Sequence, residues 1–281
     1  MQKAEKMQAL REFAAEIRVE TLKTIGSLGF GHVGGSMSIA DAMAVLYGDI
    51  MKIDPKNPRW EDRDWCVLSK GHAGPCAYAT LGLKGFYPLE ETRTLNKPGT
   101  NFPSHTDRTK TPGVDLTTGS LGQGMSTATG AALGNKLDGR DSHVFVFVGD
   151  GECDEGQVWE AAQFAAHYKL DNLCAFVDWN GLQIDGPVKD VMNPTPLDEK
   201  FGAFGWHVIM IDAHDIAAID AAVKEAKATK GQPTAIIAKS VKGKGVSYME
   251  NAVNWHGAAP KQEQYEIAVK ELDAKIAELS K

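Results

Sequence analysis

An uninterrupted apolar run, Val144 to Val148, constrains the fold of this chain more than any other feature of its sequence. A strand with one solvated face alternates apolar and polar residues, whereas this run has no polar position, so both faces must be buried. The strand is expected over His143 to Val148. A helical pattern from Asp154 to His167 and a second apolar run from Leu173 to Asp178 follow it. Strand, helix and strand in this order predict a β-α-β unit of a parallel sheet.

The same alternation is expected along the rest of the chain. Further strands are predicted at Trp65–Leu68, Trp206–Ile211 and Thr234–Lys239. Further helices are predicted at about Leu10–Ile25, Ser38–Tyr47, Gly122–Leu137, Ile216–Ala228 and Lys261–Lys281. No internal repeat or linker interrupts the pattern. The sequence therefore predicts one doubly wound, mostly parallel α/β domain over residues 1–281, with helices on both faces of the sheet.

Three segments lack a regular period and are candidates for binding loops. Gly29–Ser36 follows the first helix, Ser69–Gly74 follows the first strand, and Phe86–Leu116 is unusually long. A loop of that length inside a compact domain usually has a function, and loops at the ends of rigid elements often carry the site.

Composition excludes several classes of partner. The formal charge is −7 and the chain has no long basic run, so nucleic acid and anionic membranes are not expected to bind. The segment Met1–Glu20 is charged throughout, and no stretch reaches the roughly 18 apolar residues of a membrane span. We therefore expect a cytoplasmic protein. The four cysteines lack the spacing of a zinc site or the density of a disulfide framework and are expected to be reduced and structural.

Polar residues follow two neighbouring strands of the predicted sheet. Asp150 lies between Gly149 and Gly151 after the first strand of the β-α-β unit, and Asn180 follows the second. The carboxyl ends of parallel strands meet at one sheet edge, where open α/β sheets bind ligands. A carboxylate, an amide oxygen and one backbone carbonyl would suit Mg²⁺ and leave room for two diphosphate oxygens and a water. The alternative is that Asp150 is only the N-cap of the next helix.

The spacing of these residues resembles the motif by which thiamine-diphosphate enzymes hold their cofactor through Mg²⁺. Twenty-eight residues separate Gly149-Asp150-Gly151 from Asn180. By this resemblance Asp150, Asn180 and the Leu182 carbonyl would be the metal ligands, and Ca²⁺ or Mn²⁺ are alternatives to Mg²⁺. Gly149 and Gly151 would approach the diphosphate.

A second segment narrows the resemblance to one family. Thr117–Gly124 is similar to the Thr-Thr-Gly-Pro-Leu-Gly-Gln-Gly loop of transketolases, with Ser120 in place of the commoner proline. The resemblance implies that Gly119 accepts a hydrogen bond from the aminopyrimidine of the cofactor and that Leu121 packs on it. Taken alone, the segment is a glycine-rich loop that caps the next helix.

Four loop histidines complete the resemblance: His32, His72, His105 and His256. Each lies in a segment similar to a transketolase segment whose histidine faces the substrate near the thiazolium ring. A lone loop histidine is usually a solvated surface group. Proton transfer to and from sugar hydroxyls near neutral pH suits imidazoles with ordinary pKa values near 6.5, so these four are the candidate catalytic residues.

The remaining polar candidates are weaker. Glu155 and Glu160 match carboxylates that cluster at the transketolase dimer interface near the cofactor, although both also suit the first turns of a helix. A structural role is expected for the other histidines, His143, His167, His207 and His214. A solvated loop is expected for Lys239, Lys242 and Lys244, and the alternative is that one of them contacts a phosphate.

The resemblance covers about Leu10 to Lys270 and implies a chain that works with a partner. Transketolases continue into a second thiamine-binding domain, whose glutamate activates the aminopyrimidine, and into a C-terminal domain. We therefore expect a heterotetramer of two copies of this chain and two of a C-terminal subunit, with sugar phosphates as substrates. Val33 and Ser104-His105-Thr106-Asp107 depart from the family pattern and affect the expected substrate contacts.

Other functions remain open from the sequence. The α subunit of a 2-oxoacid dehydrogenase and deoxyxylulose-phosphate synthase share the metal motif, but they lack the similarity around Thr117–Gly124 and the four histidines. A specialised transketolase for an unusual sugar phosphate and a non-catalytic, cofactor-binding chain are the further alternatives.

Overall fold

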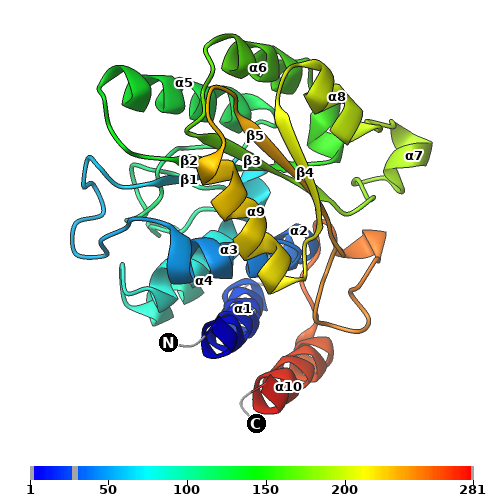
Figure 1. Ribbon diagram of the computed structural model, residues 1–281. Helices are drawn as coiled ribbons and strands as arrows, with labels where there is room; N and C mark the ends of the chain where they lie inside the picture. The colour runs from blue at the N-terminus through cyan, green and yellow to red at the C-terminus, as the bar shows by residue number, and fades with distance from the viewer. Residues whose placement is uncertain (1–2, 27–30, 280–281) are drawn as a thin grey trace.

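One parallel sheet organises the molecule (Figure 1). The computed structural model describes residues 3–26 and 31–279. The strands are β1 (Trp65–Leu68), β2 (Val144–Gly149), β3 (Leu173–Trp179), β4 (His207–Asp212) and β5 (Thr234–Lys239). They lie in the order β1-β2-β3-β5-β4, and every neighbouring pair is parallel. The predicted fold class is confirmed.

Helices cover both faces of the sheet, as the apolar run in β2 requires. Val146 packs in one core with helices α5 (Gln123–Leu137), α6 (Gly156–His167) and α8 (Leu197–Ala203). Phe147 packs in the other core with α1 (Lys3–Gly26), α3 (Ala40–Val45), α4 (Gly74–Leu83) and α9 (Ile216–Ala228). Figure 1 shows these two layers above and below the strands. Adjacent residues of β2 therefore belong to opposite cores, which accounts for the absence of a polar position.

Most predicted elements are confirmed, and the differences lie where packing overrides local preference. The segment expected as a loop at Gly29–Ser36 contains the short helix α2 (Val33–Met37), while its residues 29–30 lie outside the described part of the chain. Glycines disfavour helix in isolation, but every residue of α2 is buried. The helix expected at Ser38–Tyr47 is interrupted, because α3 passes into a wider turn at Leu46–Ile50.

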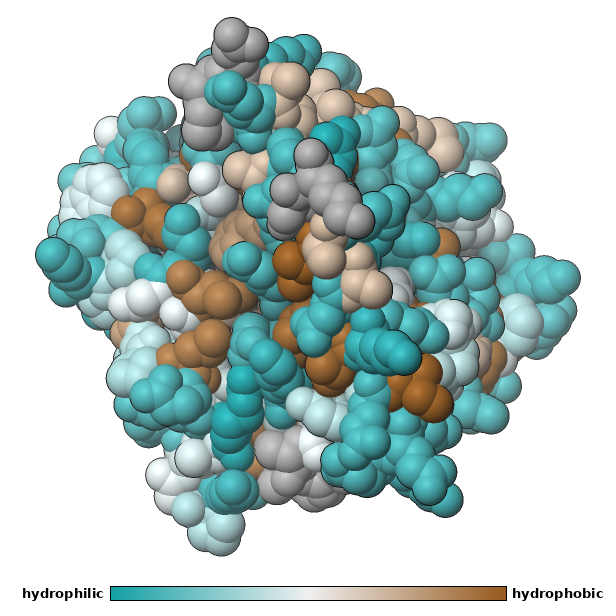
Figure 2. Space-filling model, turned by 90° about the horizontal axis from the view of Figure 1, so that it is seen from below, coloured by the Kyte–Doolittle hydropathy of each residue, from teal (hydrophilic) through white to brown (hydrophobic). Residues whose placement is uncertain are grey.

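Besides α2, the helix α4 and two short helices were not predicted, whereas the expected C-terminal helix is confirmed. α7 (Val188–Val191) and α8 lie between β3 and β4 and are too short to show a period in sequence. α10 (Gln262–Leu279) packs along α1, where the Tyr265 ring lies against Gly26. The face that carries α1 and α10 shows small apolar patches separated by hydrophilic side chains (Figure 2).

The long segment Phe86–Leu116 is irregular apart from one short helix at Leu89–Thr94. Its packing is nevertheless specific: the ring of Phe102 lies 4.9 Å from that of Tyr87, and Asp115 pairs with Arg63 at 2.7 Å in the interior. These contacts fix the backbone that carries His105.

The cysteines are all buried, and none forms a disulfide, in agreement with a structural role. None of the helices within residues 3–26 and 31–279 has both the length and the apolar character to cross a membrane.

Candidate functional site

A cavity of about 330 Å³ opens at the carboxyl ends of the central strands. The structure brings eleven of the predicted site residues to its wall: His32, His72, His105, Gly119, Leu121, Gly149, Asp150, Gly151, Asn180, Leu182 and His256. They come from segments as far apart in sequence as α2 and the loop before α10. Parallel strands bring these segments together, as expected from the order of the elements.

Asp150 and the turn at Asn180–Leu182 lie together where β2 and β3 end. The Gly181 N–H donates to the Asp150 carboxylate at 2.5 Å, so the turn at Asn180–Leu182 lies against that carboxylate. The Gly151 N–H donates to its other oxygen at 2.8 Å, which is the N-cap role that sequence allowed. Burial and the nearby Asp178 charge raise the pKa of Asp150 to about 6.

This donor set fits a hard divalent cation. A buried carboxylate, an amide oxygen and a carbonyl are the kinds of oxygen ligand that Mg²⁺ takes. The Leu182 carbonyl already accepts a hydrogen bond from the positively charged Lys242 at 3.1 Å, so it is available to a cation. In the described part of the chain, no three His, Cys, Asp or Glu side chains gather into a metal-binding group. A cation would therefore be held by Asp150, Asn180 and Leu182 together with oxygens of a ligand.

The four histidines form one cluster. The His32 ring lies 5.2 Å from that of His72, 6.0 Å from that of His105 and 5.7 Å from that of His256, between ring centroids. Burial lowers the pKa of all four, and the Lys242 charge helps to lower that of His256 to about 3. The ordinary pKa expected from sequence is therefore wrong. These imidazoles are neutral near pH 7 and can donate or accept hydrogen bonds.

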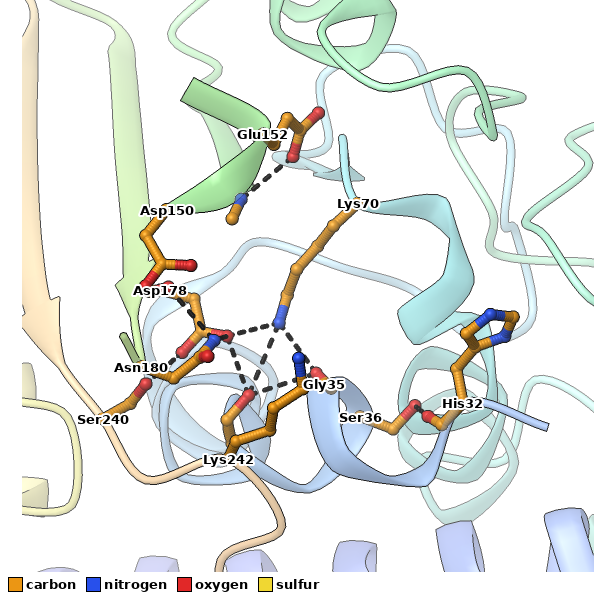
Figure 3. Close-up of polar contacts among 12 residues, drawn as sticks. His32, Gly35, Ser36, Lys70, Asp150, Glu152, Asp178, Asn180, Ser240 and Lys242 are labelled. Carbon is orange, nitrogen blue, oxygen red and sulfur yellow. Dashed lines mark hydrogen bonds and ion pairs between the residues drawn. The ribbon is translucent and has the colours of Figure 1, made fainter. Parts of the chain in front are cut away.

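A buried ion pair lies beside the cavity, where Lys70 lines the wall and pairs with Asp178 (Figure 3). Lys70 contacts Asp178 at 2.5 Å and donates to the Gly35 carbonyl at 2.7 Å. Asp178 also accepts hydrogen bonds from Ser38 at 2.8 Å, from Ser240 and from the Asn180 amide at 3.1 Å. Both charges of the ion pair are therefore satisfied, and the network holds the Asn180 side chain with its amide nitrogen directed at Asp178.

Lys242 was predicted to be solvated, and this prediction is wrong. The residue is only 2% exposed and lines the cavity. It donates to Leu182 and contacts the His256 Nδ1 at 2.7 Å. Burial and the charge of Lys70 lower the pKa of Lys242 to about 8. Its place just beyond the last predicted strand was the available signal, because the carboxyl end of β5 lies at the same edge as Asp150.

Glu152 is a cavity residue that the sequence did not reveal. It accepts hydrogen bonds from Ser69, from the Gly122 N–H at 2.8 Å and from the Gly149 N–H at 2.9 Å, and so joins the loop after β1, the start of α5 and the end of β2. Glu155 and Glu160, in contrast, are exposed and do not line the cavity. Their role at an interface stays a prediction.

Known proteins resemble this chain along most of its length. Residues 10–276 match the family model described as transketolase, thiamine diphosphate binding domain. The chain is 50% identical to a 6-deoxy-6-sulfo-D-fructose transketolase subunit of Clostridium sp. (strain MSTE9), covering 94% of this chain and 96% of the relative. It is 40% identical to one of the apulose-4-phosphate transketolase subunits of Phocaeicola vulgatus, covering 89% of each.

A solved structure shows the same fold. A mutant transketolase from Pichia stipitis superposes with a TM-score of 0.88 at 32% identity, over 95% of this chain. The match covers 40% of that transketolase, so this chain corresponds to less than half of the longer protein.

Proposed function

This chain belongs to the transketolase family, as its N-terminal, thiamine-diphosphate-binding part, and we propose that it is one half of a two-chain enzyme. The proposed reaction moves a two-carbon ketol unit from a ketose phosphate to an aldose phosphate. The observation that carries the proposal is the convergence of the Asp150 oxygen site and the four histidines on one cavity. A cytoplasmic location is part of the proposal.

The cavity supports the expected cofactor and metal. Asp150, Asn180 and the Leu182 carbonyl would hold Mg²⁺, with Ca²⁺ and Mn²⁺ as alternatives, and Lys242 would add positive charge beside the diphosphate. Gly119 and Leu121 would meet the rings of the cofactor. Thiamine diphosphate supplies the electron sink that C–C bond cleavage next to a carbonyl requires.

The histidines would handle the protons of the sugar. Neutral imidazoles at His32, His72, His105 and His256 can accept a hydroxyl proton and return it, and their clustering orients several hydroxyls at once. Besides burial, the Lys70 charge lowers the pKa of His72, and the charge of Lys242, which contacts His256, lowers that of His256. We propose that this pair hydrogen-bonds the substrate as neutral groups rather than as cations.

A partner chain completes the proposal. Two relatives that this chain nearly spans are named as subunits. We infer a C-terminal transketolase subunit that carries the glutamate activating the aminopyrimidine, in a heterotetramer of two copies of each chain. Glu155 and Glu160 are proposed to lie near that interface.

The identity of the sugar is a separate question. A ketose phosphate is the first proposal, and the 50% identity to a 6-deoxy-6-sulfo-D-fructose transketolase subunit favours a sulfonated ketose as a second. A sulfonate presents an anionic tail much as a phosphate does, so both fit the same reaction.

The test is ketol transfer with the chain alone, the candidate partner alone and the mixture, each with Mg²⁺ and thiamine diphosphate. Xylulose 5-phosphate and 6-deoxy-6-sulfo-D-fructose serve as donors and ribose 5-phosphate as acceptor, with an Asp150→Asn mixture as the control. Activity only in the wild-type mixture supports the proposal, and the preferred donor decides the sugar. Cofactor binding without transfer from either donor overturns the proposed reaction, and absence of cofactor binding overturns the proposed site.

A further inference from the structure

His214 lies outside the cavity but is bound on both ring nitrogens. It follows β4, in the turn before α9. The Val241 N–H donates to its Nε2 at 2.9 Å, and its Nδ1 lies 2.7 Å from the Asp41 carboxylate. A backbone N–H is always a donor, so Nε2 must be the acceptor and Nδ1 must carry the proton. The two contacts therefore define a single neutral tautomer.

Asp41 is a fixed acceptor for that proton. It is buried in α3 and pairs with the buried Arg18 of α1, which donates through both terminal nitrogens. Burial opposes ionisation of Asp41, but the Arg18 charge and the hydrogen bonds from His214 and Arg18 lower its pKa to about 2. The carboxylate thus orients the imidazole much as the carboxylates behind metal-bound histidines orient those rings.

The other side of His214 leads to the cavity. Val241 directly precedes Lys242, whose Nζ contacts the Leu182 carbonyl and the His256 Nδ1. The next residue, Gly243, donates its N–H to the Gly34 carbonyl of α2 at 3.0 Å. The backbone that carries Lys242 is therefore held on one side by α2 and on the other by His214.

We propose that His214 is a positioning residue: with Asp41 and Arg18, it fixes the Val241 backbone and thereby places Lys242 and His256 at the cavity. The expected effect of His214 on cofactor binding rests on the proposed function. The tautomer of His214 and its hydrogen bonds do not depend on that function. A histidine with a purely structural role would stabilise α1, α3 and β4 without affecting ligand binding.

Two substitutions separate these roles. In His214→Gln the side-chain oxygen can reach the position of Nε2 and accept the hydrogen bond from the Val241 N–H, but the hydrogen bond to Asp41 is lost. In His214→Asn the side chain reaches only the position of Nδ1, so the hydrogen bond to Asp41 is kept and the Val241 N–H is left without its acceptor. Each variant loses one of the two hydrogen bonds, and both should be destabilised to a similar extent.

Cofactor affinity gives the decisive comparison. We expect His214→Asn to raise the apparent dissociation constant of thiamine diphosphate about tenfold in the assembled enzyme, and His214→Gln to stay within about threefold of wild type. His207→Asn is the matched control, because that histidine contacts Glu225 at the far end of β4. Equal affinities for the Asn and Gln variants, or a larger loss in Gln, would overturn the proposal.

The wild-type chain provides a test that needs no variant. Long-range ¹H–¹⁵N NMR of histidine-labelled protein reports the tautomer of each imidazole. A neutral, Nδ1-protonated His214 is expected, and an Nε2-protonated or doubly protonated ring at pH 7 would overturn the proposal. If wild type binds no thiamine diphosphate, the proposed function fails while this measurement still decides the position of the His214 proton.

Discussion

The cavity histidines owe their charge state to burial and to two lysines. Lys70 lowers the pKa of His72, and Lys242 contacts His256, so a proton added to either ring would meet a positive charge in a poorly solvated space. The same lysines that suit an anionic ligand therefore keep the histidines neutral. Positively charged lysines and uncharged histidines can share a small cavity for this reason.

The free energy of unfolding should depend on pH, because the buried histidines of the cavity are neutral in the folded chain. The folded pKa of His256 is about 3, below the roughly 6.5 of an unfolded histidine, so the unfolded state binds more protons between these values. Stability should therefore fall as pH drops below about 6.5 and stop falling for this group near pH 3. Urea unfolding of wild type and His256→Asn from pH 8 to pH 5 measures the effect.

The His256→Asn variant should show the shallower dependence on pH, because it removes one of the groups that must stay neutral. Parallel curves for the two proteins would contradict the lowered pKa. His167→Asn is a suitable control, since that exposed histidine of α6 lies outside the cluster.

Elements with a strong period were predictable, while contacts between elements were not. β1, β5 and α9 have the predicted bounds because each is a clear apolar run or an amphipathic pattern. Asp150 and Asn180 were found because strand order alone brings them together. Lys70 and Asp178 form an ion pair across 108 positions, and nothing local to either residue indicates its partner. The burial of Lys242 was missed although its place just beyond the last predicted strand was a usable signal.

The start of α5 depends on close contact with the loop after β1. A Cβ at Gly124 would overlap the Ser69 Cα, which is backbone and cannot turn aside. We expect Gly124→Ala to lower the free energy of unfolding by about 1–3 kcal/mol and to weaken cofactor binding, because Ser69 and Gly122 both bind Glu152 beside the cavity.

The same helix offers a matched control for that substitution. A Cβ at Gly130 would meet no atom within 4 Å, so Gly130→Ala should raise stability by up to about 1 kcal/mol through helix propensity. Chemical denaturation of both variants checks the pair. Equal effects would show that the contact with Ser69 is unimportant.

At the scale of the whole molecule, ligand binding should raise the free energy of unfolding. The Mg²⁺ complex of thiamine diphosphate, at a hundred times its dissociation constant, should stabilise the folded chain by about 2.7 kcal/mol, because it would bind the folded state and not the unfolded one. The expected rise in melting temperature, about 5 °C for a chain of this size, should disappear when EDTA removes the metal.

Asp150→Asn distinguishes this site from any other. The variant should fold but gain almost no stability from the two ligands, since it lacks the only carboxylate among the proposed metal ligands. A full shift in this variant, or one that survives EDTA, would place the cation elsewhere.

The wall of the cavity is assembled from positions between His32 and His256, which has a consequence for synthesis on the ribosome. The first histidine of the wall emerges more than two hundred residues before the last. A growing chain can complete β1, β2 and β3 and still lack part of the wall. Synthesis must therefore pass His256 before a ligand can find all of its contacts with this chain, and capture of the ligand would report that these distant segments have come together.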